Sequence, residues 1–233
     1  MSDPVRIALV GATGLIGRDV IAAASGHPGI TLLTLSRRRP AMPLVKDIHS
    51  LVGDPPGWAE GLAAFRPDVL ICALGTTWRK VGRNEAAFRA VDHDLVLATA
   101  RAALEAGAAR MVTISSVGAD SAARSFYLRV KGEIERDLRT LEWSRLDILR
   151  PGLLRGSRVA ESRAAETAAI LLSPFTDRLL HGGLRKYRSV PAADVAQAAL
   201  ALASEARPGV FIHHHDAIRR AARGWLASFE RQE

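Results

Sequence analysis

Val5-Arg-Ile-Ala-Leu-Val10, followed at once by Gly11-Ala-Thr-Gly14-Leu-Ile-Gly17, is the stretch that decides the fold. The first part is a short run of β-branched and aliphatic residues, which is typical of a buried strand. Helical spacing begins at Leu15 and continues to about Ala24. The stretch therefore predicts a strand, a glycine turn and a helix.

The same alternation continues along the chain. Further strands are predicted at 30–35, 69–74, 111–116, 146–150 and 210–212, with a weak one around 45–48, and helices at 58–65, 85–106, 126–141, 164–172, 192–203 and from about 216. Strands that alternate with helices require a parallel sheet covered on both faces. We predict an α/β fold: a doubly wound, Rossmann-type domain over residues 1–233, with about six to seven strands and a small substrate-side region at about 152–190.

The composition bounds the class of protein. The chain has 233 residues, 48% of them hydrophobic, which is enough for one large core. Its one cysteine, Cys72, lies in an apolar run and excludes an internal disulfide, and the amino terminus lacks the order of an export signal. A cytoplasmic location is expected, with no membrane span because no apolar run approaches ~20 residues.

The net charge of +8 is compatible with nucleic acid, with an anionic cofactor or with a generally arginine-rich chain. The arginines are scattered along the sequence and no nucleic-acid reading motif accompanies them. We expect no nucleic-acid partner. A small carbonyl substrate is expected instead, and a homodimer or a protein partner stays possible.

The glycines of the G-x-x-G-x-x-G turn allow a close backbone approach, so the N–H groups at the helix start can face a pyrophosphate. An ordinary glycine turn without a ligand is the alternative, but the strand before and the helix after favour dinucleotide binding. The predicted cofactor residues of this first turn are Gly11, Thr13, Gly14, Leu15, Ile16 and Gly17. A second turn, Ala73-Leu-Gly-Thr76, follows the buried strand at 69 and should pass beneath the cofactor.

The end of the second strand distinguishes the two nicotinamide cofactors. NAD binders commonly place an acid there to hold the ribose hydroxyls. Here Ser36, Arg37 and Arg38 stand in its place and offer a hydroxyl and two cations to a 2′-phosphate. A solvated basic loop is the alternative. We predict NADP(H) in preference to NAD(H).

Tyr127 and Lys131 are four residues apart on a predicted helix and therefore share a face. A phenol, with a reference pKa near ~10, needs a nearby cation to exchange a proton near neutral pH, and Lys131 can provide it. Ser115 and Ser116 end the preceding strand, and Ser116 is the preferred partner for a substrate oxygen. An exposed amphipathic pair is the alternative interpretation of Tyr127 and Lys131.

The chain resembles short-chain dehydrogenases/reductases of the atypical class, in particular their Tat-interacting-protein oxidoreductase-like branch, over nearly its whole length. The residues that carry the resemblance are Gly11–Gly17, Ser36–Arg38, Ala73–Thr77, Val91-Asp92, Ile114–Ser116, Tyr127–Glu133 and Leu149–Gly152.

The resemblance implies that Tyr127 is the general acid/base, that Lys131 binds the nicotinamide ribose, that Ser116 positions the carbonyl and that Pro151 borders the nicotinamide. Two departures stand out. Asn84, the one asparagine, precedes the long helix in which the larger family often has an Asn, so a proton relay through Asn is doubtful. The interval between Ser116 and Tyr127 is short, so substrate contacts are expected mainly from residues 155–187.

The predicted function is an NADPH-dependent oxidoreductase acting on a carbonyl or alcohol. The alternative is a regulatory protein that binds NADPH without turnover. No metal site is predicted, because the internal run His213-His-His215 follows a strand and suggests a surface turn. Asp147 lies within a predicted strand, where alternation makes it an exposed or edge residue as easily as a catalytic carboxylate, and no role is assigned to it.

Overall fold

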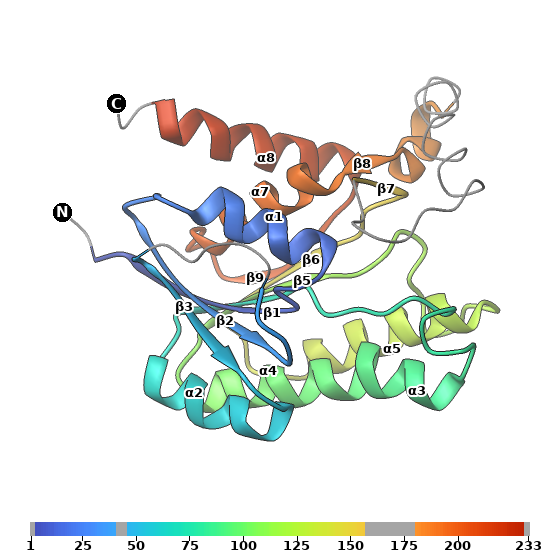
Figure 1. Cartoon of the computed structure of the whole chain (residues 1–233). Coiled ribbons are helices and arrows are strands. Elements are labelled where there is room, and N and C mark those ends of the chain that lie inside the picture. Colours follow the sequence, from blue (N-terminus) through green and yellow to red (C-terminus); the bar gives the residue numbers. More distant parts are fainter. Residues whose placement is uncertain (1–2, 41–45, 157–179, 231–233) are drawn as a thin grey trace.

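The computed structural model describes residues 3–40, 46–156 and 180–230, which build a parallel sheet of seven strands (Figure 1). The strand order is β3-β2-β1-β4-β5-β6-β9. The strands are β1 (Val5–Val10), β2 (Ile30–Ser36), β3 (Ile48–Val52), β4 (Val69–Cys72), β5 (Arg110–Ile114), β6 (Arg145–Leu149) and β9 (Gly209–His213). The predicted doubly wound α/β fold is confirmed.

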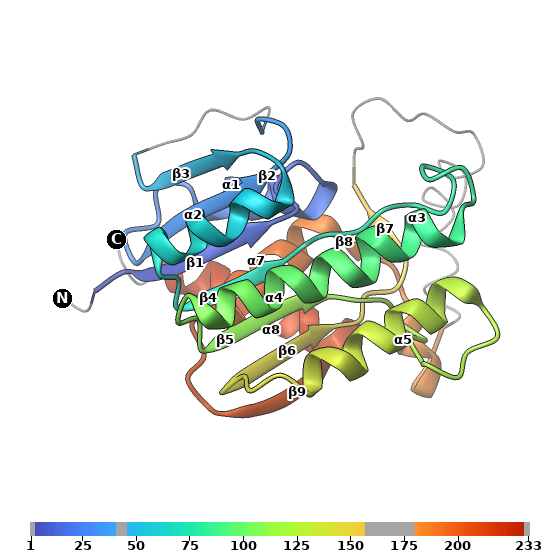
Figure 2. The same ribbon diagram turned by 90° about the horizontal axis from the view of Figure 1, so that it is seen from below.

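The strands are apolar on both faces because helices cover both. Along β1, Ile7 and Leu9 pack into one core, whereas Ala8 and Val10 pack into the other. The first core is closed by α1 (Leu15–Ala24), α7 (Ala192–Ala203) and α8 (His215–Glu230), and the second by α2 (Trp58–Phe65), α4 (Leu95–Glu105) and α5 (Phe126–Arg139). Figure 2 shows the second set lying across its face of the sheet.

The direction of strand order reverses at β1, and this creates the place for a site. Val10 pairs with Leu35 of β2 on one side and with Cys72 of β4 on the other. In open α/β sheets, ligands bind beyond the carboxyl ends of the strands at such a reversal. The residues that follow β1, β2 and β4 therefore meet at one edge.

Two elements differ from their predicted form. The weak strand expected around 45–48 is β3, which begins at Ile48. The helix predicted at 85–106 consists of α3 (Glu85–Arg89), a π-helical turn η2 (Ala90–Asp94) and α4, and the Asn84 side chain caps its start by accepting the Ala87 N–H at 2.9 Å. The helix predicted at 164–172 lies outside the described residues.

Short elements near the carboxyl edge were not predicted. β7 (Leu154–Arg155) pairs in parallel with β8 (Val190–Pro191). The 3₁₀ turn η3 (Gly182–Tyr187) precedes β8, and another 3₁₀ turn, η1 (Pro55–Gly57), leads into α2. Gly152 permits the pairing, since a Cβ there would lie 2.4 Å from the Arg188 carbonyl oxygen. Of the described helices, none is long and apolar enough to span a membrane.

Asp147 is neither exposed nor on an edge strand, so that interpretation was wrong. β6 lies between β5 and β9, and Asp147 is 1% exposed. Its carboxylate accepts from Arg145 Nε at 2.6 Å and lies 2.7 Å from His213 Nε2. The histidine run is likewise not a simple surface turn, because His213 ends β9, His215 begins α8, and all three side chains are half-buried.

Candidate active site

The first glycine turn is held by close backbone contacts. Gly11 has φ +88°, and a Cβ there would lie 2.4 Å from the Ala73 carbonyl carbon. The Gly14 N–H donates to the Gly11 carbonyl at 2.9 Å. Gly14 is also the N-cap of α1 and provides no side-chain cap, so the first N–H groups of this helix are available to an anion.

A cavity of about 450 Å³ opens beside this turn, at the carboxyl edge predicted from the strand order. Its described lining residues are Gly11, Thr13, Gly14, Leu35, Ser36, Arg37, Arg38, Trp58, Ala73, Leu74, Gly75, Thr76, Lys80, Val81, Ala87, Val91 and Leu95. We call it the cofactor crevice. Arg37, Arg38 and Lys80 are cationic, and no carboxylate is among the described lining residues. The crevice therefore favours an anion.

The Ser36 side chain orders the turn after β2. Its hydroxyl is buried and donates to the Arg38 carbonyl at 2.8 Å, while the Gly53 N–H donates to the Ser36 carbonyl at 3.0 Å. Arg37 and Arg38 are exposed on the rim of the crevice. The Ser36 hydroxyl hydrogen is therefore already bound within the turn. The guanidinium groups of Arg37 and Arg38 are the side-chain donors that this turn presents to the crevice.

Not every predicted cofactor residue lines this cavity. Leu15, Ile16, Gly17, Lys131 and Pro151 are not among its described lining residues. Ile16 is 8% exposed and belongs to the core on the α1 side, whereas Leu15 lies against Gly156, where a Cβ would be 3.0 Å from its Cδ1. Gly17 packs against the turn itself.

Sequence reasoning missed part of the lining. Ala87, Val91 and Leu95 line the crevice at helical spacing from three successive turns of the segment that contains α3, η2 and α4. Their spacing is a signal that the sequence offered. Trp58 closes another side, with its indole N–H donating to the Gly53 carbonyl at 3.0 Å, and was not among the predicted cofactor residues.

A buried ion pair lies next to the crevice. Lys131 Nζ is 2.9 Å from Asp92 Oδ1, with side chains 7% and 0% exposed, and Asp92 Oδ2 accepts the Thr76 N–H at 2.8 Å. Burial lowers the pKa of Lys131, but Asp92, and next to it Tyr127, outweigh this effect and leave the pKa above its usual value. Lys131 is therefore a cation whose charge is compensated by Asp92, a role that the sequence did not assign to Asp92.

Tyr127 lies in the first turn of α5. Its ring is half-buried and meets the Phe88 ring edge-on at a centroid distance of 5.8 Å. Tyr127 and Lys131 lie one turn apart on α5, and the tyrosine contributes to the raised pKa of Lys131.

The two serines that end β5 have different surroundings. The Ser115 hydroxyl is buried and donates to Glu135 at 2.5 Å, and Glu135 also accepts from Arg150 Nε at 2.9 Å. This network links β5, α5 and the end of β6. The Ser116 hydroxyl is half-buried, and its one hydrogen bond to a described residue is a 3.3 Å contact to the Val117 carbonyl. Of the two serines, Ser116 therefore has the more weakly bound hydroxyl.

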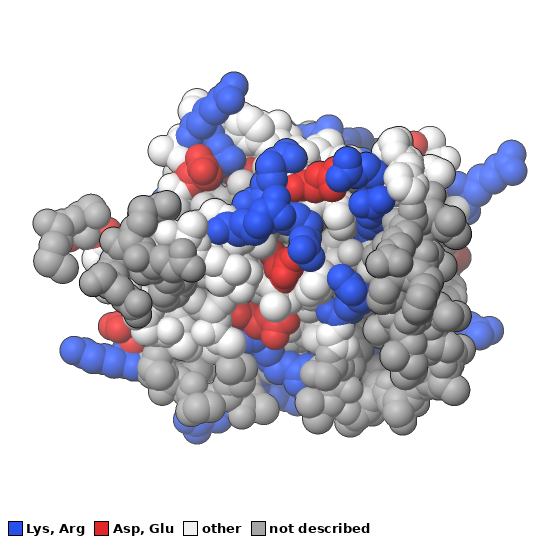
Figure 3. All heavy atoms as spheres, turned by 90° about the horizontal axis from the view of Figure 1, so that it is seen from above, with Lys and Arg blue, Asp and Glu red and all other residues white. Residues whose placement is uncertain are grey.

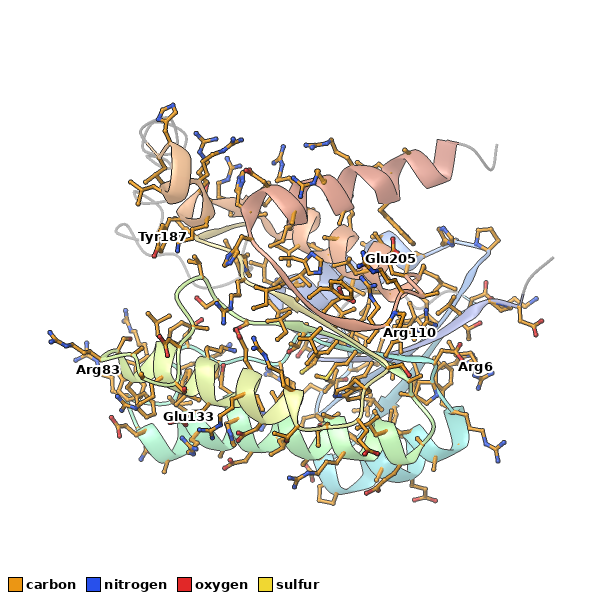
Figure 4. The ribbon with its side chains drawn as sticks, turned by 180° about the vertical axis from the view of Figure 1, so that it is seen from behind. Arg6, Arg83, Arg110, Glu133, Tyr187 and Glu205 are labelled. Carbon is orange, nitrogen blue, oxygen red and sulfur yellow. The ribbon has the colours of Figure 1, made fainter. Side chains whose placement is uncertain are left out.

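The segment between Ser116 and Tyr127 folds back on α5. The Asp120 N–H donates to the Leu128 carbonyl at 3.1 Å, and a Cβ at Gly132 would lie 2.1 Å from the Asp120 carbonyl carbon. On the other side of the sheet, η3 lies at the same end of the molecule, as the positions of Tyr187 and Glu133 show (Figure 4). The described residues contain no cluster of three His, Cys, Asp or Glu side chains that could hold a metal.

Sequence comparison supplies the family. A family model described as HIM1 matches residues 66–181. "Protein fmp52, mitochondrial" of Aspergillus fumigatus is 38% identical over 202 residues, which is 84% of this chain and 85% of that protein. The chain belongs to the fmp52 family. "Protein FMP52, mitochondrial" of Candida albicans is 32% identical and covers 84% of this chain and 87% of its own length.

These fmp52 relatives correct one expectation. Their names place them in mitochondria, so the prediction of a cytoplasmic location was wrong. The single cysteine and the absence of an export-signal pattern did not separate the two locations. None of the relatives named here carries the name of the Tat-interacting-protein branch.

Solved structures share the fold of this fmp52-family chain. The Bordetella bronchiseptica enzyme WbmG in complex with NAD superposes with a TM-score of 0.69, at 17% identity, over 98% of this chain and 79% of that one. A UDP-N-acetylglucosamine 4-epimerase from Methanobrevibacter ruminantium also gives 0.69, at 12% identity, over 91% of this chain and 77% of that one. The likeness shows a Rossmann-type fold.

Proposed function

We propose that this chain is a nicotinamide-dependent oxidoreductase that binds NADP(H) in the cofactor crevice. The observation that carries the proposal is the free start of α1 beside a cavity lined by cations and by no described carboxylate. The residues fit such a cofactor, since Gly14 leaves the entrance open for a diphosphate and Arg37 and Arg38 can hold a 2′-phosphate. WbmG, which has the same fold, is seen with NAD.

When bound, the cofactor supplies or accepts a hydride. The residues of the chain handle the proton and the substrate oxygen. In the reducing direction, the Tyr127 hydroxyl donates its proton to the carbonyl oxygen, and the Ser116 hydroxyl donates a hydrogen bond to the same oxygen as charge develops there. Lys131 would stabilise the tyrosinate that remains and would hold the nicotinamide ribose, and Pro151 would border the ring. These roles, and the placement within the Tat-interacting-protein branch, rest on the resemblance.

The cofactor preference is tested by titrating NADPH and NADH calorimetrically against the parent protein. The double variant R37A/R38A should lose at least about tenfold in affinity for NADPH and little for NADH, because only the 2′-phosphate loses its partners. Arg39 is exposed next to them but does not line the crevice, so R39A is the matched control. Equal affinities in the parent would overturn the NADP(H) preference, and no heat with either nucleotide would overturn the cofactor site itself.

The chemical step is tested by turnover of NADPH against a panel of small carbonyl compounds. Tyr127→Phe should abolish turnover and leave NADPH affinity nearly unchanged. Ser116→Ala should lower kcat, whereas Ser115→Ala should lower thermal stability without an effect on kcat, because its hydroxyl is bound to Glu135. Full activity of Tyr127→Phe would refute its role.

A second candidate function is a regulator that binds NADPH without consuming it. It is favoured by the Asp92–Lys131 pair, since a compensated lysine lowers the pKa of a nearby phenol less than a free one does. The panel separates the two functions: the regulator binds NADPH with no Tyr127-dependent oxidation of any carbonyl. Asp92→Asn gives a further test, because it removes the carboxylate that compensates the charge of Lys131. If the protein is an enzyme whose turnover is limited by this ion pair, the variant should have a higher turnover than the parent.

A further inference from the structure

The fold gathers arginines that are distant in the sequence. A second cavity, of about 570 Å³, is formed by β7, η3 and the first turns of α8. Its described lining residues are Arg155, Arg185, Arg188, Ser189, His215, Asp216, Arg219, Arg220 and Arg223. We call it the arginine cavity. Figure 3 shows Lys and Arg side chains gathered on this face of the molecule, with acidic side chains between some of them.

The charges in this cavity are not balanced. Asp216 is the one carboxylate among its described lining residues, against six guanidinium groups. Arg185 is 3.3 Å from Asp216, and Arg219 is 2.9 Å from Asp194 outside the cavity. Within the described part of the chain, Arg220 and Arg223 have no acidic group within salt-bridge distance.

Arg155 carries a donor that the described residues do not use. Its Nε is buried and has no hydrogen-bond partner among them. A buried donor that is left unsatisfied costs about 1–3 kcal/mol, and more when the group is charged. Like charges that line a concave surface also repel each other more strongly than on an open one. An anion in the cavity would offset this repulsion.

The pattern of donors selects the kind of anion. Guanidinium groups bind phosphate oxygens through paired N–H donors, and several such groups around one cavity suit a ligand with several anionic oxygens. A volume of about 570 Å³ holds a small molecule. A planar membrane would meet the exposed Arg220 and Arg223 but would not enter the cavity, and a nucleic acid is usually bound along an extended groove.

We propose that the arginine cavity binds a compact, soluble small molecule that carries a diphosphate or two neighbouring phosphate groups. It shares no described lining residue with the cofactor crevice, so the inference does not depend on the proposed function. Two of its described lining residues, Arg155 and Arg185, belong to the region 155–187 from which substrate contacts are expected.

Inorganic pyrophosphate is the probe. The parent protein is titrated calorimetrically at physiological ionic strength, with saturating NADPH present so that the cofactor crevice is occupied. The double variant R220Q/R223Q removes two exposed charges from the wall of the cavity and should fold normally. The matched control R101Q/R136Q removes two exposed arginines from α4 and α5. Thermal melting of all three proteins verifies folding.

The expected result is saturable binding at one site in the parent and in the control, weakened at least about tenfold in R220Q/R223Q. NADPH affinity should be equal in all three proteins, so failure here is distinguishable from failure of the cofactor site. Binding that is lost in R37A/R38A but kept in R220Q/R223Q would overturn the proposal, because the anion would then lie in the cofactor crevice. It would be overturned too by binding to phosphatidylserine vesicles or to an oligonucleotide without binding of pyrophosphate.

Discussion

Gly17 sets how closely α1 approaches the turn before it. A Cβ at this position would lie 2.2 Å from the Gly11 carbonyl oxygen, a backbone atom that cannot move without shifting the turn. Gly17→Ala should therefore destabilise the protein by about 1–3 kcal/mol, despite the better helix propensity of alanine, and should weaken NADPH binding. Urea unfolding and nucleotide titration measure the two effects.

Gly57 provides the matched control for this substitution. It lies before α2 with φ −79°, and a Cβ there would meet nothing within 4 Å. Gly57→Ala should leave stability and NADPH affinity within error of the parent, since neither space nor backbone conformation opposes a methyl group. A Gly17→Ala protein as stable as Gly57→Ala would contradict the close approach.

Single residues show which parts of the site could be predicted from sequence. The placement of Gly11, Gly14, Arg37 and Arg38 beside the crevice was predictable because each of them follows a strand, and strands can be recognised from local periodicity. Asp92 was not assigned a role, because its pairing with Lys131 joins segments far apart in the chain. Tertiary contacts of this kind leave no local pattern.

At the scale of elements, the Asp92–Lys131 pair joins η2 to α5. Asp92→Asn removes the compensating charge but keeps an oxygen that can accept the Thr76 N–H, so the effect isolates the ion pair. Leaving a buried lysine uncompensated should cost about 3–5 kcal/mol of unfolding free energy. Without Asp92, burial should also bring the pKa of Lys131 down from its raised value.

The control for this substitution is the double variant Asp92→Asn/Lys131→Met. Removing both charges replaces the pair by neutral groups of similar size, which is commonly far less costly than breaking it. The double variant should therefore recover stability relative to Asp92→Asn in urea unfolding. If both variants are equally unstable, the loss comes from packing rather than from an unpaired charge.

Most helices and strands were predictable because their apolar residues recur at periods that belong to one kind of element. The exceptions are those that depend on other elements. β7 and β8 are two residues long and exist because backbone can approach Gly152, and the π-helical turn η2 interrupts a segment whose periodicity predicts one continuous helix.

At the scale of the whole molecule, the fold redistributes charge in a way that composition does not reveal. The arginines are spaced along the chain, yet six of them line one cavity. Asp147, which alternation alone could not place, is buried because β9 pairs beside β6 and covers it. The order of the strands decides which residues become buried or gather in one place. That order follows from the crossover connections and not from Asp147 or the arginines themselves.

Acid should destabilise the whole molecule through His27 and His214, whose charged forms the fold disfavours. His27 stacks on Trp225 at a centroid distance of 4.6 Å and accepts the Gly29 N–H through Nδ1. Burial lowers the pKa of His27 from its ordinary value, although a backbone hydrogen bond partly opposes this, and burial likewise lowers the pKa of His214. Below a pH of about 6.5 the unfolded chain takes up protons that the folded protein resists. The unfolding free energy should therefore fall as the pH drops below about 6.5, and it should level off once the folded histidines are also protonated.

His27→Asn tests this assignment, because its side-chain oxygen can still accept the Gly29 N–H but does not titrate. Urea unfolding at neutral pH and below the ordinary histidine pKa gives the acid-induced loss for each protein. That loss should be smaller in His27→Asn than in the parent, even though the lost stacking on Trp225 lowers stability at both pH values. His49→Asn removes an exposed imidazole from β3 and is the matched control. If His27→Asn and the control both lose as much stability on acidification as the parent does, burial is not what opposes the protonation of His27. A histidine that is protonated equally in the folded and unfolded states contributes nothing to the pH dependence of stability.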